Sequence, residues 1–133
     1  MTELRLGFLA SHSGTNMQAI IDSVKNGYFK AHLCAAISNN SQSGALERAR
    51  KEGIPAFHVS EKTHPGKVGQ QVIEIFDKYQ VNTVVLAGYM KKLEPFVIDH
   101  FNGRVLNIHP ALLPKFGGEG MYGINVHKAV IEA

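Results

Sequence analysis

Apolar residues along this chain fall into two alternating patterns. Short continuous apolar runs are typical of strands buried on both faces, and apolar residues spaced three or four apart are typical of amphipathic helices. The two patterns alternate from one end of the sequence to the other. The continuous runs predict strands at residues 4–10, 33–38, 56–59, 83–87 and 104–108.

Four helices are expected between these strands. In the first, the apolar residues 17, 20, 21 and 24 share one helical face, and Thr15 with Gln18 resembles a capping box. The second helix is expected at residues 43–52 and the fourth at residues 92–101. The third is expected to open at His64-Pro65, because proline is favoured in the first turn of a helix.

This order of elements predicts an α/β fold. Strands that alternate with helices indicate a doubly wound, Rossmann-like, mostly parallel sheet with helices on both faces. In such a fold, ligands bind at the carboxyl ends of the strands, near the point where the strand order reverses. The residues expected to form a site are therefore those that follow each strand, at positions 11–16, 38–40, 88–93 and 107–115.

Composition narrows the class of protein. Of the 133 residues, 44% are hydrophobic and 19% are charged, as expected of one globular domain. The net charge of +3 comes without a basic stripe, so nucleic-acid binding is not expected. No apolar stretch approaches the ~20 residues of a membrane span, and no secretion signal is recognised. We therefore expect a cytoplasmic protein that binds no membrane.

Metal and cysteine chemistry are not expected either. The single cysteine, Cys34, argues against a disulfide framework and a cysteine-based zinc site. Cys34 lies in an apolar run, which favours a core residue over a nucleophile. No two of the seven histidines are spaced as H-x-x-x-H or H-E-x-x-H, so no zinc site is expected.

The turn after the first strand is a candidate phosphate site. Gly14, Thr15 and Asn16 open the first helix, where free N–H groups and the helix dipole favour an anion. The turn lacks the G-x-G-x-x-G fingerprint, and no acidic residue follows the second strand, so NAD is not expected. The alternative is an ordinary helix start that binds nothing.

Asn107 and His109 form the candidate catalytic pair. In an extended chain, residues i and i+2 point to the same side, about 6–7 Å apart, and Pro110 favours extended geometry at His109. An amide donor can stabilise an oxyanion, and a histidine can exchange a proton near neutral pH. The pair therefore suits acyl transfer through a tetrahedral intermediate, unless both side chains only satisfy backbone groups at the strand end.

At this segment the chain resembles a known family. Residues 107–118, NIHPALLPKFGG, resemble the signature of the phosphoribosylglycinamide formyltransferase family, and SGTNMQAII and VVLAGYMKKL resemble it in order and spacing. The resemblance implies transfer of a formyl group from 10-formyltetrahydrofolate to the amine of N1-(5-phosphoribosyl)glycinamide in purine (IMP) biosynthesis. It implies no metal and no covalent enzyme intermediate, and it leaves a homodimer open.

The resemblance also implies roles for individual residues. Asn107 would hold the formyl oxygen, and His109 would be the general acid. The resemblance assigns the substrate phosphate to Gly14, Thr15 and Asn16, and the folate to Met90, Lys91, Lys92, Leu93 and Asn107.

Several positions depart from the family pattern. Lys91 stands where arginine is common, and Lys92 where an apolar residue is common. Near the third helix, Lys67 is the candidate replacement for an arginine that faces the folate tail. The family's catalytic aspartate, in a stretch after S/T-G-x-T-x-H, has no counterpart here, so residues 1–133 are expected to be a single formyltransferase domain that lacks its C-terminal strands and helix.

Two other functions stay open on this reading. The chain could be a catalytically impaired fragment that still binds ligands, or a 10-formyltetrahydrofolate hydrolase in which water replaces the amine.

Overall fold

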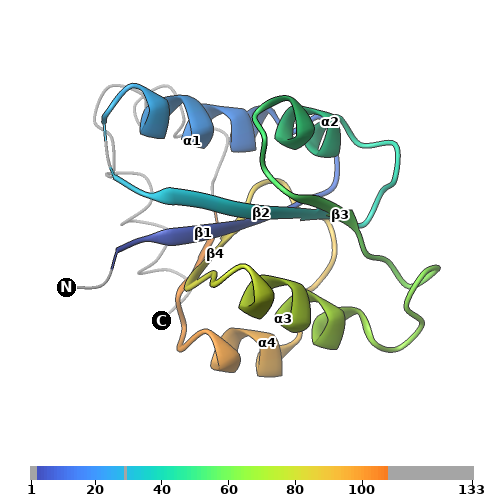
Figure 1. Ribbon diagram of the computed structural model, residues 1–133. Helices are drawn as coiled ribbons and strands as arrows, with labels where there is room; N and C mark the ends of the chain where they lie inside the picture. Colours follow the sequence, from blue (N-terminus) through green and yellow to red (C-terminus); the bar gives the residue numbers. More distant parts are fainter. Residues whose placement is uncertain (1–2, 29, 108–133) are drawn as a thin grey trace.

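The computed structural model describes residues 3–28 and 30–107, and within them it shows one sheet of five parallel strands in the order β3-β2-β1-β4-β5 (Figure 1). The strands are β1 (Arg5–Ala10), β2 (His32–Ser38), β3 (Ala56–His58), β4 (Thr83–Leu86) and β5 (Val105–Asn107). The helices are α1 (Thr15–Lys25), α2 (Gly44–Lys51), α3 (Val68–Lys78) and α4 (Pro95–His100). The predicted α/β class and its parallel sheet are confirmed.

The helices cover the two faces of the sheet in pairs. In Figure 1, α1 and α2 lie above the sheet, and α3 and α4 lie below it. The chain winds from β1 outward through β2 to β3, returns to the other side of β1 with β4, and continues to β5. The strand order therefore reverses between β2 and β4, with β1 between them.

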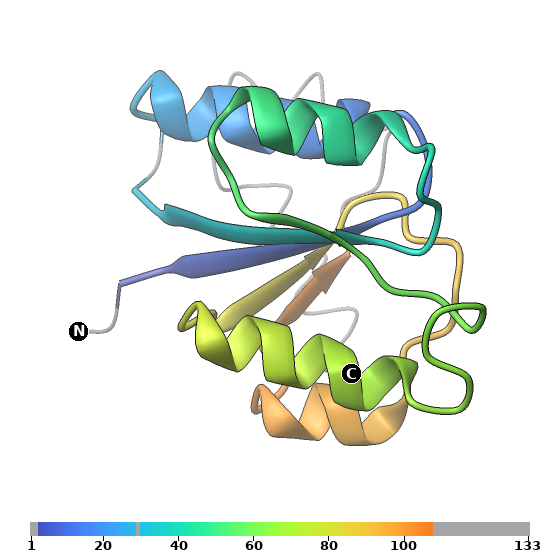
Figure 2. The same cartoon turned by 45° about the vertical axis from the view of Figure 1, so that its right-hand side comes forward.

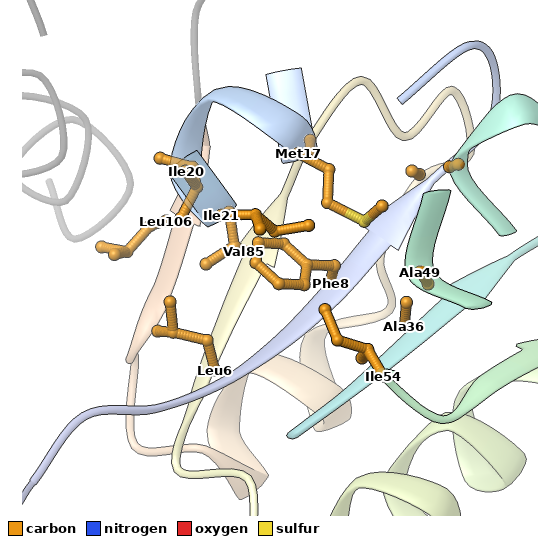
Figure 3. Packing of buried hydrophobic residues seen from close by; sticks show 13 residues of the cluster. Leu6, Phe8, Met17, Ile20, Ile21, Ala36, Ala49, Ile54, Val85 and Leu106 are labelled. Atoms are coloured by element: carbon orange, nitrogen blue, oxygen red, sulfur yellow. The ribbon is translucent and has the colours of Figure 1, made fainter. Parts of the chain in front are cut away.

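Each face of the sheet has its own apolar core. On the face of α1 and α2, Phe8 is fully buried, and Figure 3 shows Met17, Ile21 and Val85 around its ring. On the face of α3 and α4, Leu9 packs with a second cluster that includes Phe76. Neighbouring residues of β1 enter opposite cores because side chains alternate along a strand, which explains why its apolar run is continuous.

The predicted start of α3 is wrong by several residues. Residues 60–67 form turns, in which the Ser60 N–H bonds to the Thr63 hydroxyl at 2.9 Å and the Gly66 N–H bonds to Glu61 Oε1 at 2.8 Å. Gly66 has a φ of 71°, which a right-handed helix does not allow. The helix therefore begins at Val68, because these local side-chain bonds compete with helical ones.

The predicted capping box at the start of α1 is also wrong. Thr15 is the first helical residue, and the N-cap is Gly14, which makes no side-chain capping bond. The Gln18 amide instead donates to Asp22 Oδ1 at 3.0 Å and to Glu52 Oε2 at 3.2 Å. The Gln18 side-chain oxygen, which a capping box would use to accept from the main chain, accepts from Arg48 Nη1 at 3.5 Å.

The other boundaries that the structure describes agree with the predictions or differ from them by at most three residues. The largest of these shifts is in α4, which starts at Pro95 rather than at position 92; proline at the first helical position suits this start because its missing N–H needs no partner there. Ser43 caps α2, accepting from the Leu46 N–H.

The prediction that Cys34 is a core residue is confirmed, because the residue is buried. Burial also raises the pKa of the thiol, which disfavours the reactive thiolate.

The close packing around Gly7 predicts that a larger residue there destabilises the core between β1 and α3. A Cβ at Gly7 would lie 2.8 Å from Phe76 Cε1 and 2.9 Å from Val81 Cγ1. We expect Gly7→Ala to lower the free energy of unfolding by about 1–3 kcal/mol through overpacking, measured by urea unfolding.

Phe76→Leu supplies the control for this steric cause. Phe76 is fully buried and cannot swing away, so a smaller residue there should relieve the contact. The double variant should lose clearly less stability than the sum of the two single variants. Additive losses would contradict the proposed clash.

Candidate active site

The carboxyl ends of the strands bring the predicted site residues to one edge of the sheet. Figure 2 shows the loops that follow β1, β2, β3 and β4 gathered on its right-hand side. Because the strands are parallel, Ala10 pairs with Ser38 and Leu86 pairs with Asn107 at this edge. The loops at positions 11–14, 39–43, 59–67 and 87–94 lie there, as the topology predicts.

The turn before α1 is packed tightly against α2. Gly14 is buried, has a φ of 81°, and a Cβ there would lie 2.6 Å from Ala45 Cα, so only glycine fits without a shift. The Ala45 N–H donates to the His12 carbonyl at 3.1 Å, and Arg48 Nε donates to the Ser13 carbonyl at 2.7 Å. These bonds hold the turn in place at the start of α1.

This arrangement leaves donors available for an anion. Among residues 3–28 and 30–107, no acceptor is bonded to the N–H groups of Thr15, Asn16 and Met17. Such groups at a helix start, together with the helix dipole, suit phosphate. The Asn16 amide nitrogen lies 3.8 Å from the position of a Cβ on Gly88, so the turn adjoins the loop after β4. The geometry is therefore compatible with the predicted phosphate site, which stays a prediction.

A cavity of about 240 Å³ lies at the same edge. It is bounded by the loops that follow β2, β3 and β4, and it includes the predicted folate residues Lys91 and Lys92. Glu61 and Glu94 also line it, so two positive and two negative side chains meet at its walls. The complete lining is Asn39, Ser60, Glu61, Val68, Tyr89, Lys91, Lys92 and Glu94.

Tyr89 is a polar group in this cavity that lies within the predicted site segment 88–93 but was not singled out from the sequence. Its side chain is half-buried, and the pKa of its phenol is raised by burial and by the negative charges of Glu61 and Glu94. The phenol therefore stays neutral at neutral pH and can both donate and accept a hydrogen bond. An aromatic residue in the loop that follows a buried strand would have been the signal.

A second missed residue is Ser11, at the end of β1. Ser11 lies in the segment 11–16 that the topology predicts to be part of the site, but its residue pattern alone gives it no role. In the structure its hydroxyl donates to Asn39 Oδ1 at 2.5 Å and accepts from the Met90 N–H at 2.8 Å. It connects the loops that follow three adjacent strands.

The other predicted residues that the structure describes do not line this cavity. Met90 is exposed, and Leu93 is half-buried and packs against the core under α3 and α4. Neither is among the residues that line the cavity. Asn107 ends β5 beside Leu86 and is exposed. His109 lies outside the described residues, so the structure does not test its pairing with Asn107. Lys67 is exposed at the start of α3 and is not among the residues that line the cavity.

Two further expectations concern what the protein does not bind. In the part of the chain that the structure describes, no helix is both long and apolar enough to span a bilayer. Over the same residues, no three histidine, cysteine, aspartate or glutamate side chains are grouped as ligands for a metal ion. The expected absence of metal and NAD stays a prediction.

Fold and site together define a doubly wound α/β domain with an anion-compatible helix start and a cavity at the carboxyl edge of its sheet. Residues 4–133 match the formyl transferase family. The chain belongs to this family, and the resemblance to its phosphoribosylglycinamide formyltransferases is confirmed by the relatives that follow.

Two curated relatives are phosphoribosylglycinamide formyltransferases. The Escherichia coli enzyme is 37% identical over 126 residues, which are 93% of this chain and 57% of the relative. The chloroplastic enzyme of Arabidopsis thaliana is 36% identical over 132 residues, which are 97% of this chain and 45% of the relative. The chain therefore spans about half the length of the curated relatives it matches.

A solved structure agrees with these relatives. Glycinamide ribonucleotide transformylase 1 from Symbiobacterium toebii is 38% identical, with a TM-score of 0.77 over 86% of this chain and 55% of that one.

The charges around Tyr89 generate a pH-dependent prediction. Because its pKa is raised in the folded state, the unfolded chain loses this proton first as the pH rises. We therefore expect the wild-type protein to lose stability, relative to Tyr89→Phe, as the pH rises above the ordinary tyrosine value of about 10. Denaturant unfolding over this pH range would measure the difference.

A spectroscopic titration isolates the same group. The ultraviolet absorbance of phenolate, taken as wild type minus Tyr89→Phe, should give a pKa above the ordinary value. Glu61→Gln should lower this pKa, whereas Glu3→Gln, at the opposite edge beside His32, should leave it unchanged. An ordinary pKa in the wild-type protein would contradict the described environment.

Proposed function

We propose that this chain is part of an enzyme that transfers the formyl group of 10-formyltetrahydrofolate to the amine of N1-(5-phosphoribosyl)glycinamide, a step of purine biosynthesis. The observation that carries the proposal is the identity of 36–37% with two phosphoribosylglycinamide formyltransferases over more than nine tenths of this chain. The partners are then two small molecules, the ribonucleotide and the formyl-folate.

The phosphate of the ribonucleotide is proposed to bind at Gly14, Thr15 and Asn16. Support comes from the unbonded N–H groups at the start of α1 and from the rigid attachment of the preceding turn to α2. Because the donors belong mainly to the backbone, this anion site needs no lysine or arginine. That agrees with the modest net charge of +3.

The folate is proposed to bind beside the loop after β4. Lys91 and Lys92 offer positive charge to the carboxylates of a folate tail, while Glu61 and Glu94 offset that charge across the cavity. The neutral Tyr89 adds a hydrogen-bonding group with an aromatic face. Shape and hydrogen bonds, more than an excess of positive charge, would therefore select the ligand here.

The chemistry is assigned to Asn107 and His109. The ribonucleotide amine attacks the formyl carbon, and the Asn107 amide stabilises the negative oxygen of the tetrahedral intermediate. The bond between the formyl carbon and the folate nitrogen then breaks. His109 donates a proton to that nitrogen, and the attacking amine releases one proton to solvent water. No covalent enzyme intermediate and no metal enter these steps.

The cellular location stays a prediction as well. The Arabidopsis relative is named as chloroplastic, so membership of the family does not by itself place this protein in the cytoplasm.

The acid role of His109 predicts the effect of removing it. In the protein as encoded, His109→Ala should lower kcat by at least the ~10²-fold typical of a general acid. His32→Ala is the matched control, because His32 is exposed at the start of β2, at the opposite edge of the sheet. Near-normal turnover by His109→Ala would contradict the role of His109 as the general acid.

If the glycinamide ribonucleotide accepts the formyl group, consumption of the formyl-folate should depend on the presence of this amine. Consumption of 10-formyltetrahydrofolate by the wild-type protein should require the glycinamide ribonucleotide and should yield one formylated ribonucleotide for each folate consumed. Equal consumption without the amine would instead identify a hydrolase. Binding of both ligands without consumption would identify a ligand-binding fragment.

A further inference from the structure

Ser11 occupies the central position of the candidate site. It directly follows β1, which lies between β2 and β4 in the sheet. Its residue is only 2% exposed, so its hydroxyl makes its hydrogen bonds inside the protein. The role proposed next rests on the function proposed above.

The hydroxyl of Ser11 bonds to two different loops at once. It donates to the Asn39 side chain in the loop after β2, at 2.5 Å, and it accepts from the Met90 main chain in the loop after β4, at 2.8 Å. The main-chain carbonyl of Ser11 also accepts from the Asn40 side chain at 3.5 Å. One residue therefore joins both sides of the point where the strand order reverses.

This bond fixes the main chain in the middle of the loop after β4, whose Tyr89 and Leu93 side chains also pack against the core under α3 and α4. Within residues 3–28 and 30–107, no other hydrogen bond engages a main-chain group of residues 88–93. The Met90 side chain is 67% exposed, so packing does not hold this position. Lys91 follows directly and lines the cavity, as does Asn39. The hydroxyl thus sets the main chain from which Lys91 and Lys92 extend.

We propose that Ser11 is a positioning residue for the folate-binding loop. It would not contact either substrate. By holding the Met90 N–H and the Asn39 side chain together, it keeps the two walls of the cavity at the separation that the formyl-folate requires. Loss of the hydroxyl leaves both partners without a bond, and the loop then samples other conformations that must be reordered on binding.

The first experiment needs no substrate. Ser11→Ala is compared with Thr83→Val, since Thr83 is equally buried and its hydroxyl also donates to an asparagine Oδ1, that of Asn82, but at the amino end of β4. NMR-detected hydrogen exchange should show the Met90 amide exchanging about tenfold faster in Ser11→Ala, after correction for global stability. Thr83→Val should leave the corrected rate unchanged. Equal corrected rates in Ser11→Ala and wild type would overturn the proposal.

The second experiment measures formyl transfer by the same variants in the protein as encoded. Ser11→Ala should raise KM for 10-formyltetrahydrofolate about tenfold and change kcat by less than about threefold, because the reacting groups are untouched. A merely structural loss would lower activity in Thr83→Val to the same extent. An unchanged KM, or equal effects in the two variants, would overturn the proposed role.

The two experiments separate this proposal from the function it rests on. If the wild-type protein transfers no formyl group, the proposed function fails and the role of Ser11 toward folate fails with it, whereas faster exchange of the Met90 amide would still support its hold on the loop. If transfer occurs and KM does not respond to Ser11→Ala, the function stands and the role of Ser11 is refuted.

Discussion

The structure depends on one constraint, the parallel pairing of β1 with both β2 and β4. Parallel neighbours need crossover connections, so each strand is followed by a helix that must pack on one face of the sheet. Because all the strands point the same way, every strand-to-helix loop emerges at the same edge. The turn before α1, the cavity and Asn107 meet there for this reason, although they come from opposite ends of the described chain.

Much of the candidate site consists of main-chain groups that packing holds in position. The N–H groups at the start of α1 stay available because Gly14 supplies no capping side chain and because α2 holds the preceding turn. The loop after β4 is oriented through the Met90 N–H. Charged side chains, among them Lys91 and Glu61, then set the electrostatics of the cavity without an excess of either sign.

Local patterns predicted the elements well where packing and propensity agreed. The apolar runs located β1, β2 and β4 because strands buried on both faces must be apolar throughout. They failed at α3, where hydroxyl and carboxylate bonds around Ser60 and Glu61 build turns that override the helix signal of Pro65. They failed again at Thr15, because Gly14 provides the N-cap and Gln18 bonds to other partners.

The sequence by itself determined the α/β class, the edge of the sheet that carries the candidate site, and the family to which the chain belongs, because periodicity and motif spacing are local properties. Tertiary structure alone decided which loops meet. Ser11 reaches Met90 across 79 positions of sequence. Burial and the negative charge of Glu61 from another loop raise the pKa of Tyr89. Such contacts follow from strand order and packing, which no local pattern encodes.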